Sequence, residues 1–139
     1  MPRKAKDAKP RAIDSEKITI NLGLVDLGQI DLLVEEGFYS NRTDLIRTAI
    51  RAQIARHDET LKKTVERRSI DLGLRRFTRH DLEALVTAGE RLNAEVLGLA
   101  IIDPDVTAEL AASAIGSLRV LGALQASPAV KAALKDRMA

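Results

Sequence analysis

Cysteine is absent from this chain of 139 residues, and histidine and aromatic residues are scarce. Without cysteine there is no disulfide framework, thiol nucleophile, cysteine-ligated zinc site or iron–sulfur cluster. The two histidines, His57 and His80, offer little for a histidine-rich metal site. Phe38, Tyr39 and Phe77 are the whole aromatic set, which argues against stacking of single-stranded bases on aromatic platforms. We therefore expect no catalytic residues, no metal and no cofactor.

Long hydrophobic runs are also missing. No stretch approaches the roughly 20 apolar residues of a membrane-spanning helix. The opening residues, MPRKAKDAKPRA, lack the apolar segment of a secretory signal. We therefore expect a cytoplasmic protein of bacterial type, without a membrane partner. The composition, 45% hydrophobic and 30% charged, is that of a globular chain with one average domain or two small ones.

Basic charge is concentrated at the start of the chain. Residues 1–68 hold 14 basic and 11 acidic side chains, whereas residues 69–139 hold 8 basic and 9 acidic ones. The first 13 residues form a polar arm that cannot order itself by burial. Such an arm suits loose, sequence-independent contact with phosphate, although a solubilising tail would have the same composition. Its cations are Arg3, Lys4, Lys6, Lys9 and Arg11.

Residues 16–22 alternate apolar and polar side chains. The apolar positions are Ile18, Ile20 and Leu22, and the polar positions between them are Lys17, Thr19 and Asn21. A period of two predicts a β-strand with one apolar face. No second strand follows nearby, so the backbone groups of this strand need a partner from elsewhere.

A first helix is expected over residues 26–36. Its apolar side chains, Leu33 among them, recur at helical spacing. Asp26 is a plausible N-cap, and Gly37 follows the last turn as a C-cap residue would.

A second helix is expected to begin at Asn41. Asn41 with Asp44 three residues later is similar to a capping box. An apolar stripe that includes Ile46 and Ile50 follows, and it continues at helical spacing to about Arg67. The segment 58–60, Asp-Glu-Thr, either interrupts this helix or lies within it.

Residues 16–57 resemble the ribbon–helix–helix (CopG/Arc/MetJ-like) DNA-binding family. The resemblance rests on the alternating KITINL segment and on GFYSNRTDLIRTAIR, which is similar to that family's turn and second-helix opening. It implies a β-α-α protomer that forms an intertwined homodimer. The paired strands would form an antiparallel ribbon in the major groove of double-stranded DNA, with the N-terminus of the second helix on phosphate. The shared core would comprise Ile18, Ile20, Leu22, Leu33, Ile46 and Ile50.

The polar residues support these roles chemically. Lys17 can donate to guanine O6 or N7, Asn21 can bond adenine bidentately, and Thr19 can bond a base or touch a thymine methyl group. A merely solvated strand face is the alternative for these three. The capped helix start presents free N–H groups and a positive dipole end to an anion. Phosphate contacts are therefore expected at Ser40, Asn41, Arg42 and Thr43.

Residues 69–139 contain an internal repeat of about 24 residues. Gly73, Gly98 and Gly122 each lie in an apolar segment, and each segment precedes a helical pattern. Three βα units with neighbouring parallel strands follow from this pattern. The expected helices are 78–88, 104–115 and 127–137, with Thr78, Asp103 and Ser127 as N-caps and Pro104 and Pro128 in the first turns.

Catalytic motifs are not evident in this half. The three glycines lack a phosphate-loop context and suit close strand packing. Asp103, Asp105 and Glu109 suit helix caps and first turns better than metal ligation, and His80 suits a surface position. Three strands with helices on one face would leave the other face apolar, which favours self-association.

Together these patterns predict an α+β fold in four segments: a basic arm (1–13), a ribbon–helix–helix domain (14–58), a helical linker (59–68) and a βα-repeat domain (69–139). The predicted function is a dimeric, sequence-specific transcriptional regulator of CopG type, such as a repressor. Its last domain would oligomerise, sense an effector or bind a protein partner. The alternatives are the antitoxin and autorepressor of a toxin–antitoxin pair, and a nucleoid-associated scaffolding protein.

Overall fold

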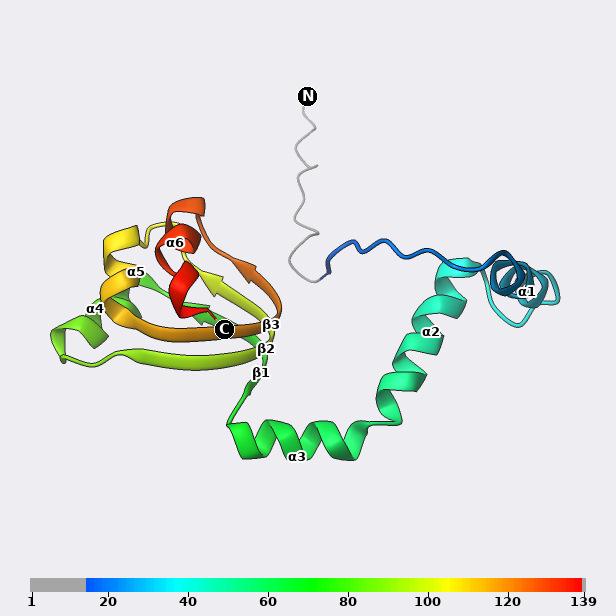
Figure 1. The fold of residues 1–139 in the computed structure, drawn as a ribbon, viewed down its shortest axis with the longest axis horizontal. Coiled ribbons are helices and arrows are strands. Elements are labelled where there is room, and N and C mark those ends of the chain that lie inside the picture. Colours follow the sequence, from blue (N-terminus) through cyan, green and yellow to red (C-terminus); the bar gives the residue numbers. More distant parts are fainter. Residues whose placement is uncertain (1–14, 139) are drawn as a thin grey trace, which may run out of the picture. The chain divides into compact units, whose positions relative to one another are not determined.

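The computed structural model describes residues 15–138, which divide into two compact units (Figure 1). The N-terminal unit spans Lys17–Thr64, and the C-terminal unit comprises the described residues from Val65 onward. The described chain is α+β, with six α-helices and a three-stranded parallel sheet. The basic arm expected at residues 1–13 lies outside the described residues.

An elongated segment leads into helix α1 (Leu24–Glu35). Residues 15–23 belong to neither a helix nor a strand, so the strand expected at 16–22 is not confirmed. The expectation that Asp26 caps α1 is wrong. Gly23 is the N-cap, because its backbone is extended and its carbonyl accepts a 3.0 Å hydrogen bond from the Leu27 N–H. Asp26 lies instead in the first turn, where a negative charge is favourable to the helix dipole.

Helix α2 (Arg42–Ala55) begins where the sequence predicts, with Asn41 as N-cap. It ends before the acidic segment, and a separate helix, α3 (Asp58–Arg68), begins there. Two acidic residues in the first turn and two arginines in the last turn both suit the dipole of α3. Ser69, with a left-handed φ of 52°, ends α3 and directs the chain into the sheet.

The C-terminal unit is built on the predicted repeat. Strands β1 (Asp71–Phe77), β2 (Leu92–Ile102) and β3 (Ile115–Gln125) pair in parallel in the order β1-β2-β3. Their register places Gly73 beside Gly98, and Gly98 beside Gly122. The offsets read from the sequence are therefore the spatial offsets between neighbouring strands.

Helices α4 (Arg79–Thr87), α5 (Ala108–Ala114) and α6 (Pro128–Ala133) lie on the concave side of the curved sheet (Figure 1). A 3-10 turn, Lys135–Arg137, follows α6. The core lies between the helices and the sheet. Its largest fully buried side chains are Leu82, Ile102, Ile115, Leu118, Leu134, Val96 and Val130.

Two of the three predicted helix caps in this unit are confirmed. Thr78 accepts from the Asp81 N–H in a complete capping box, and Ser127 accepts from the Val130 N–H, with Pro128 in the first turn. The expectation for the middle helix is wrong, because α5 begins four residues later than predicted, at Ala108. Thr107 is its N-cap.

The residues before α5 make a turn rather than a helix. The Val106 N–H donates to the Asp103 carbonyl, and the Val106 side chain is buried in the core. The carboxylate of Asp103 does not cap α5, because it forms an ion pair with Arg76, 2.7 Å away. The last helix is also shorter than expected, since α6 ends at Ala133.

Candidate nucleic-acid interface

The N-terminal unit buries none of its side chains completely. The strand residues predicted for the dimer core are exposed: Ile18 by 71%, Ile20 by 57% and Leu22 by 38%. Of the helix residues predicted for that core, Leu33 and Ile50 are exposed and Ile46 is half-buried. An apolar surface of this kind is typical of a chain that packs against another one. The structure thus leaves all six predicted core residues accessible to a partner.

The residues predicted to read bases lie in the segment before α1. Lys17, Thr19 and Asn21 are all exposed, and they alternate along the chain with the exposed apolar residues. In an extended chain, alternate side chains point to opposite sides. An ammonium, a hydroxyl and an amide can therefore share one face while the apolar side chains share the other.

The residues predicted to contact phosphate meet at the start of α2. The Asn41 side chain accepts a 2.8 Å hydrogen bond from the Asp44 N–H, and the Asp44 carboxylate accepts a 2.9 Å bond from the Ser40 N–H. These bonds fix the turn that opens the helix. The N–H groups of Arg42 and Thr43 lie in the first turn, where a helix offers them no internal acceptor. They are the backbone donors that an anion could use.

Arg42 has a partner that the sequence does not reveal. Its guanidinium donates two hydrogen bonds to the Asp31 carboxylate of α1, at 2.7 and 2.8 Å. Hydrogen bonding to Arg42 lowers the pKa of Asp31, and the same contact raises the pKa of Arg42. The pair joins the two helices. Phosphate contact by this side chain would therefore compete with Asp31.

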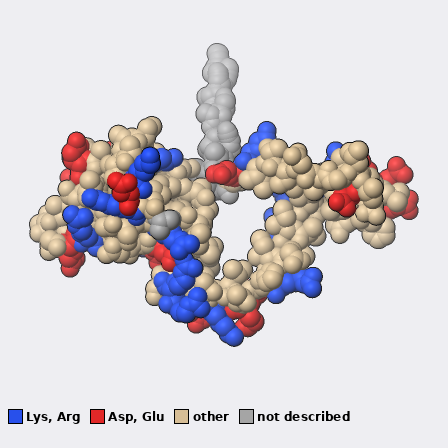
Figure 2. All heavy atoms as spheres, viewed as in Figure 1, with Lys and Arg blue, Asp and Glu red and all other residues tan. Residues whose placement is uncertain are grey.

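The C-terminal unit shows charged side chains of both signs on the face in view (Figure 2). Several of them are joined in pairs that link the strands to each other or to a helix. Glu95 of β2 accepts hydrogen bonds from Arg68 of α3, and Arg119 of β3 lies 3.5 Å from the same carboxylate. Arg76 of β1 is bound to Asp103 after β2. These pairs join residues 24 or more positions apart, so no local pattern in the sequence indicates them.

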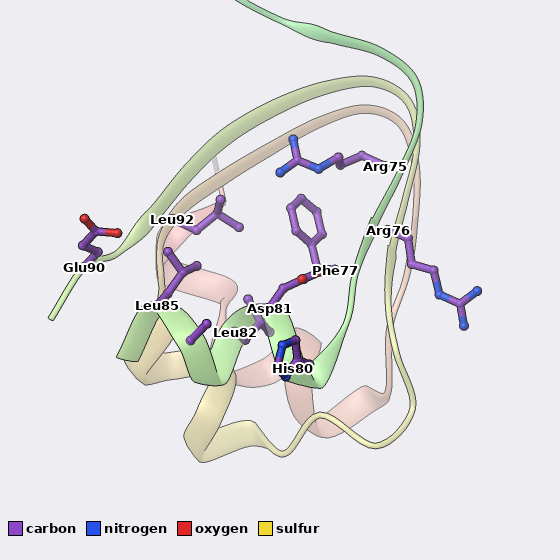
Figure 3. A pocket seen from close by; sticks show the side chains of 10 residues that line it. Arg75, Arg76, Phe77, His80, Asp81, Leu82, Leu85, Glu90 and Leu92 are labelled. Carbon is purple, nitrogen blue, oxygen red and sulfur yellow. The ribbon is translucent and has the colours of Figure 1, made fainter. Parts of the chain in front are cut away.

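A hollow of about 460 Å3 lies beside β1 and α4 (Figure 3). Arg75 lies over the ring of Phe77, 4.9 Å from its centroid, and pairs with Asp71 at 2.5 Å. Asp81 serves the cap of α4, and its hydrogen bonds from Thr78 lower its pKa. Arg75 and Asp81 are thus bound within the first repeat, whereas Arg76, which also lines the hollow, is bound to Asp103 after β2.

No group of three metal-ligating side chains occurs within residues 15–138. In the same part of the chain no helix combines the length and apolar character needed to cross a membrane.

Comparison with known proteins gives a match that includes residues of both units. No curated protein and no solved structure matches the chain. A family model does match it: that of the Ribbon-Helix-Helix transcriptional regulator family, over residues 13–131. The match covers the N-terminal helices and all three strands of the C-terminal sheet. The resemblance seen in residues 16–57 is confirmed, and the chain belongs to the ribbon–helix–helix transcriptional regulator family.

Proposed function

We propose that this regulator acts as a homodimer that binds specific sequences in double-stranded DNA. The observation that carries the proposal is the exposed, alternating segment before α1, together with membership of the family. Two copies of this segment can pair as an antiparallel ribbon, which satisfies the backbone groups of both. Pairing would place Ile18, Ile20 and Leu22 over the helices and leave the polar side chains outside.

Base reading falls to Lys17, Thr19 and Asn21. A two-stranded ribbon fits the major groove, where each base pair presents a distinct pattern of donors and acceptors. The dimer would present two copies of these three side chains, so its site is expected to be a palindrome.

Phosphate contact falls to the start of α2, through the N–H groups of Arg42 and Thr43 and the side chains from Ser40 to Thr43. The basic arm adds contact that is independent of sequence. The unit also exposes Arg47 and Arg51 on α2 and Arg56 directly after it. Phosphate contacts set the position of a protein on DNA, whereas base contacts set its preference.

The C-terminal unit supports assembly of these dimers or binding of an effector or partner. It has its own buried core, unlike a tail that folds only on binding. This ordered core favours a regulator or a scaffolding protein over a typical antitoxin. Repression, through occupation of a promoter, is the regulatory mode that we propose.

The test separates base reading from phosphate contact. Sites are selected from random DNA with the full chain, and affinities for a selected and a scrambled site are measured by fluorescence anisotropy over a range of salt concentrations. Asn21→Ala should weaken the selected site by about 1–3 kcal/mol for each of the two copies of Asn21, roughly 5- to 150-fold per copy, and leave the scrambled site unchanged. Gln29→Ala removes an exposed amide from α1 and is the matched control; it should change neither affinity.

Deletion of residues 1–12 should weaken both sites alike and flatten the salt dependence. If Asn21→Ala weakens the two sites equally, the ribbon does not read bases. If no sequence is enriched in the selection, the protein binds DNA without preference and the scaffolding alternative is favoured.

A further inference from the structure

The three glycines of the repeat form a ladder across the sheet. Gly73, Gly98 and Gly122 all have positive φ, of 108°, 138° and 127°, and they lie side by side in the register. A Cβ added to Gly98 would lie 2.9 Å from the carbonyl carbon of Gly73, and nearer still to its oxygen. A Cβ added to Gly122 would meet the Gly98 carbonyl in the same way, at 3.0 Å from its carbon. Gly98 and Gly122 therefore each accommodate the carbonyl of the strand before them.

This ladder is open at both ends. Gly73 has the conformation of the other two, yet a Cβ there would have nothing within 4 Å. At the opposite end, β3 is the last strand of the described sheet, so no glycine follows Gly122. The open space beside Gly73 could therefore receive the carbonyl of Gly122 from another copy, as Gly98 receives the carbonyl of Gly73.

The side chains beside the open edge follow the same pattern. Leu72 and Leu74 of β1 are 71% and 59% exposed, whereas Leu97 and Leu99, their neighbours in β2, are half-buried. Leu121 is the residue of β3 in the same row as Leu72 and Leu97. A further strand like β3 beside β1 would therefore place a leucine next to Leu72 and an alanine next to Leu74.

The charges on β1 do not oppose this contact. Arg75 and Asp71 lie two residues on either side of Gly73 and form an ion pair with each other. Arg75 also lies over the ring of Phe77 (Figure 3). Asp71 and Arg75 thus balance each other within β1, and Arg76 is paired with Asp103 after β2, so a neighbouring strand would meet no unpaired charge on β1.

The helical layer is open at the same end as β1. Helix α5 packs against α4 on one side and α6 on the other. On the β1 side of α4 lies the hollow of Figure 3, lined in part by Leu82, Leu85 and Leu92. The hollow leaves room beside α4 for the helix that would follow a further strand at this edge.

We infer that the C-terminal units associate head to tail, with the β3 edge of one copy paired in parallel with the β1 edge of the next copy. Neighbouring copies would pair in the same register as neighbouring strands within one copy, with Gly122 of one copy beside Gly73 of the next. Such a contact joins two different surfaces, so it continues from copy to copy. The inference goes beyond the proposed DNA binding and does not depend on it.

Engineered cysteines test the inference in the full chain, which contains no native cysteine. The contact would place Leu72 beside Leu121 of the neighbouring copy, about 5 Å away as between adjacent strands, which is within reach of a disulfide. Within one chain β2 separates these two residues by about 10 Å, which is too far for a bridge. Oxidation of the double variant Leu72→Cys/Leu121→Cys should therefore produce a ladder of covalent multimers on a non-reducing denaturing gel. The denaturant removes any dimer held only by the N-terminal unit.

Each single cysteine variant should give no ladder. A pairing of Leu72→Cys with Val86→Cys, which lies on α4 and is also exposed, is the matched control and should give none either. Gly73→Ala in the double-cysteine chain should remove the ladder, because the added methyl group would meet the Gly122 carbonyl of the next copy. Gly89→Ala, at a positive φ of 72° with open space around it, lacks that contact and should keep the ladder.

Two outcomes would overturn the inference. Covalent dimers from Leu72→Cys alone, with no larger species from the double variant, would indicate a two-fold contact through β1. Monomers from the double variant at concentrations where the chain binds DNA would show that the two edges do not meet. Loss of DNA binding with an intact ladder would count against the proposed function alone.

Discussion

Replacement of Gly98 by alanine tests the close approach of strands at the centre of the sheet. Gly98 has a φ of 138°, a conformation that residues with a side chain rarely adopt. The added methyl group would also press against the Gly73 carbonyl in the middle of the β1–β2 pairing. This neighbour is backbone, so it cannot move aside by a change of rotamer. The strands must separate or the backbone must change its conformation.

The two effects can be sized separately. Holding a non-glycine residue at a sparsely populated φ costs about 1–3 kcal/mol. Displacing closely packed neighbours costs roughly 1–3 kcal/mol more. We therefore expect Gly98→Ala to lower the free energy of unfolding of the C-terminal unit by about 2–6 kcal/mol, a large share of the stability of a typical domain. Gly89→Ala, with nothing within 4 Å of the added atom, should cost the strain alone.

Hydrogen exchange of the amides of β2, followed by mass spectrometry, measures the loss of stability in this unit alone. The loss in Gly98→Ala should exceed that in Gly89→Ala, because only the methyl group at Gly98 meets a carbonyl and because a φ of 138° lies further from the left-handed helical region than a φ of 72°. An equal loss in Gly98→Ala and Gly89→Ala would refute the reasoning, because the carbonyl contact would then have no energetic effect. Gly122→Ala should behave like Gly98→Ala, since its methyl group meets the Gly98 carbonyl.

Two further predictions concern the N-terminal unit. In a Gly73→Ala chain, whose C-terminal units should not associate, Ile20→Lys should convert the dimer to a monomer in sedimentation velocity, because a charge would be buried in the shared core. Leu32→Lys in the same chain, at the same 57% exposure but outside the predicted core, should leave the dimer intact. A dimeric Ile20→Lys chain would exclude the ribbon. Asp31→Asn should remove a stabilisation that depends on pH. Because the folded chain lowers the pKa of Asp31, this stabilisation is present above the pKa of an unfolded aspartate, about 3.9, and is lost as the pH falls through the lower folded value. Urea unfolding of the two chains should therefore differ at pH 6 and converge toward pH 2, and parallel pH profiles would contradict this role of the ion pair.

The repeat of the C-terminal unit could be predicted from the sequence in some detail. Neighbouring parallel strands repeat the same environment, so the residues that fill it recur at the same offset. The three glycines mark this offset, and the structure places them in register. Two caps were also predictable, because Thr78 and Ser127 each bond a backbone N–H only three residues away. Such contacts are local and leave a local pattern.

At two positions a distant residue binds a side chain for which the sequence predicts another role. Asp103 has the sequence position of a cap, yet Arg76 binds its carboxylate and Thr107 caps the helix instead. Arg42 likewise has the position of a phosphate contact, yet it also joins α2 to Asp31 of α1. No spacing in the sequence reveals either ion pair, since each depends on how the elements pack.

For the candidate DNA interface, the sequence alone determined the opening of α2 at Asn41 and the alternation of residues 17–22, because both depend on contacts or periodicity within a few residues. The proposed pairing of this segment is a different matter, since its hydrogen bonds would come from a second chain, and in the single chain the segment belongs to no sheet. Only the tertiary structure decided that Gly73 faces open space while Gly98 and Gly122 face a carbonyl. The three glycines look alike in the sequence. Their surroundings differ because a stack of repeats has two ends, and the position of an end is a property of the packed sheet.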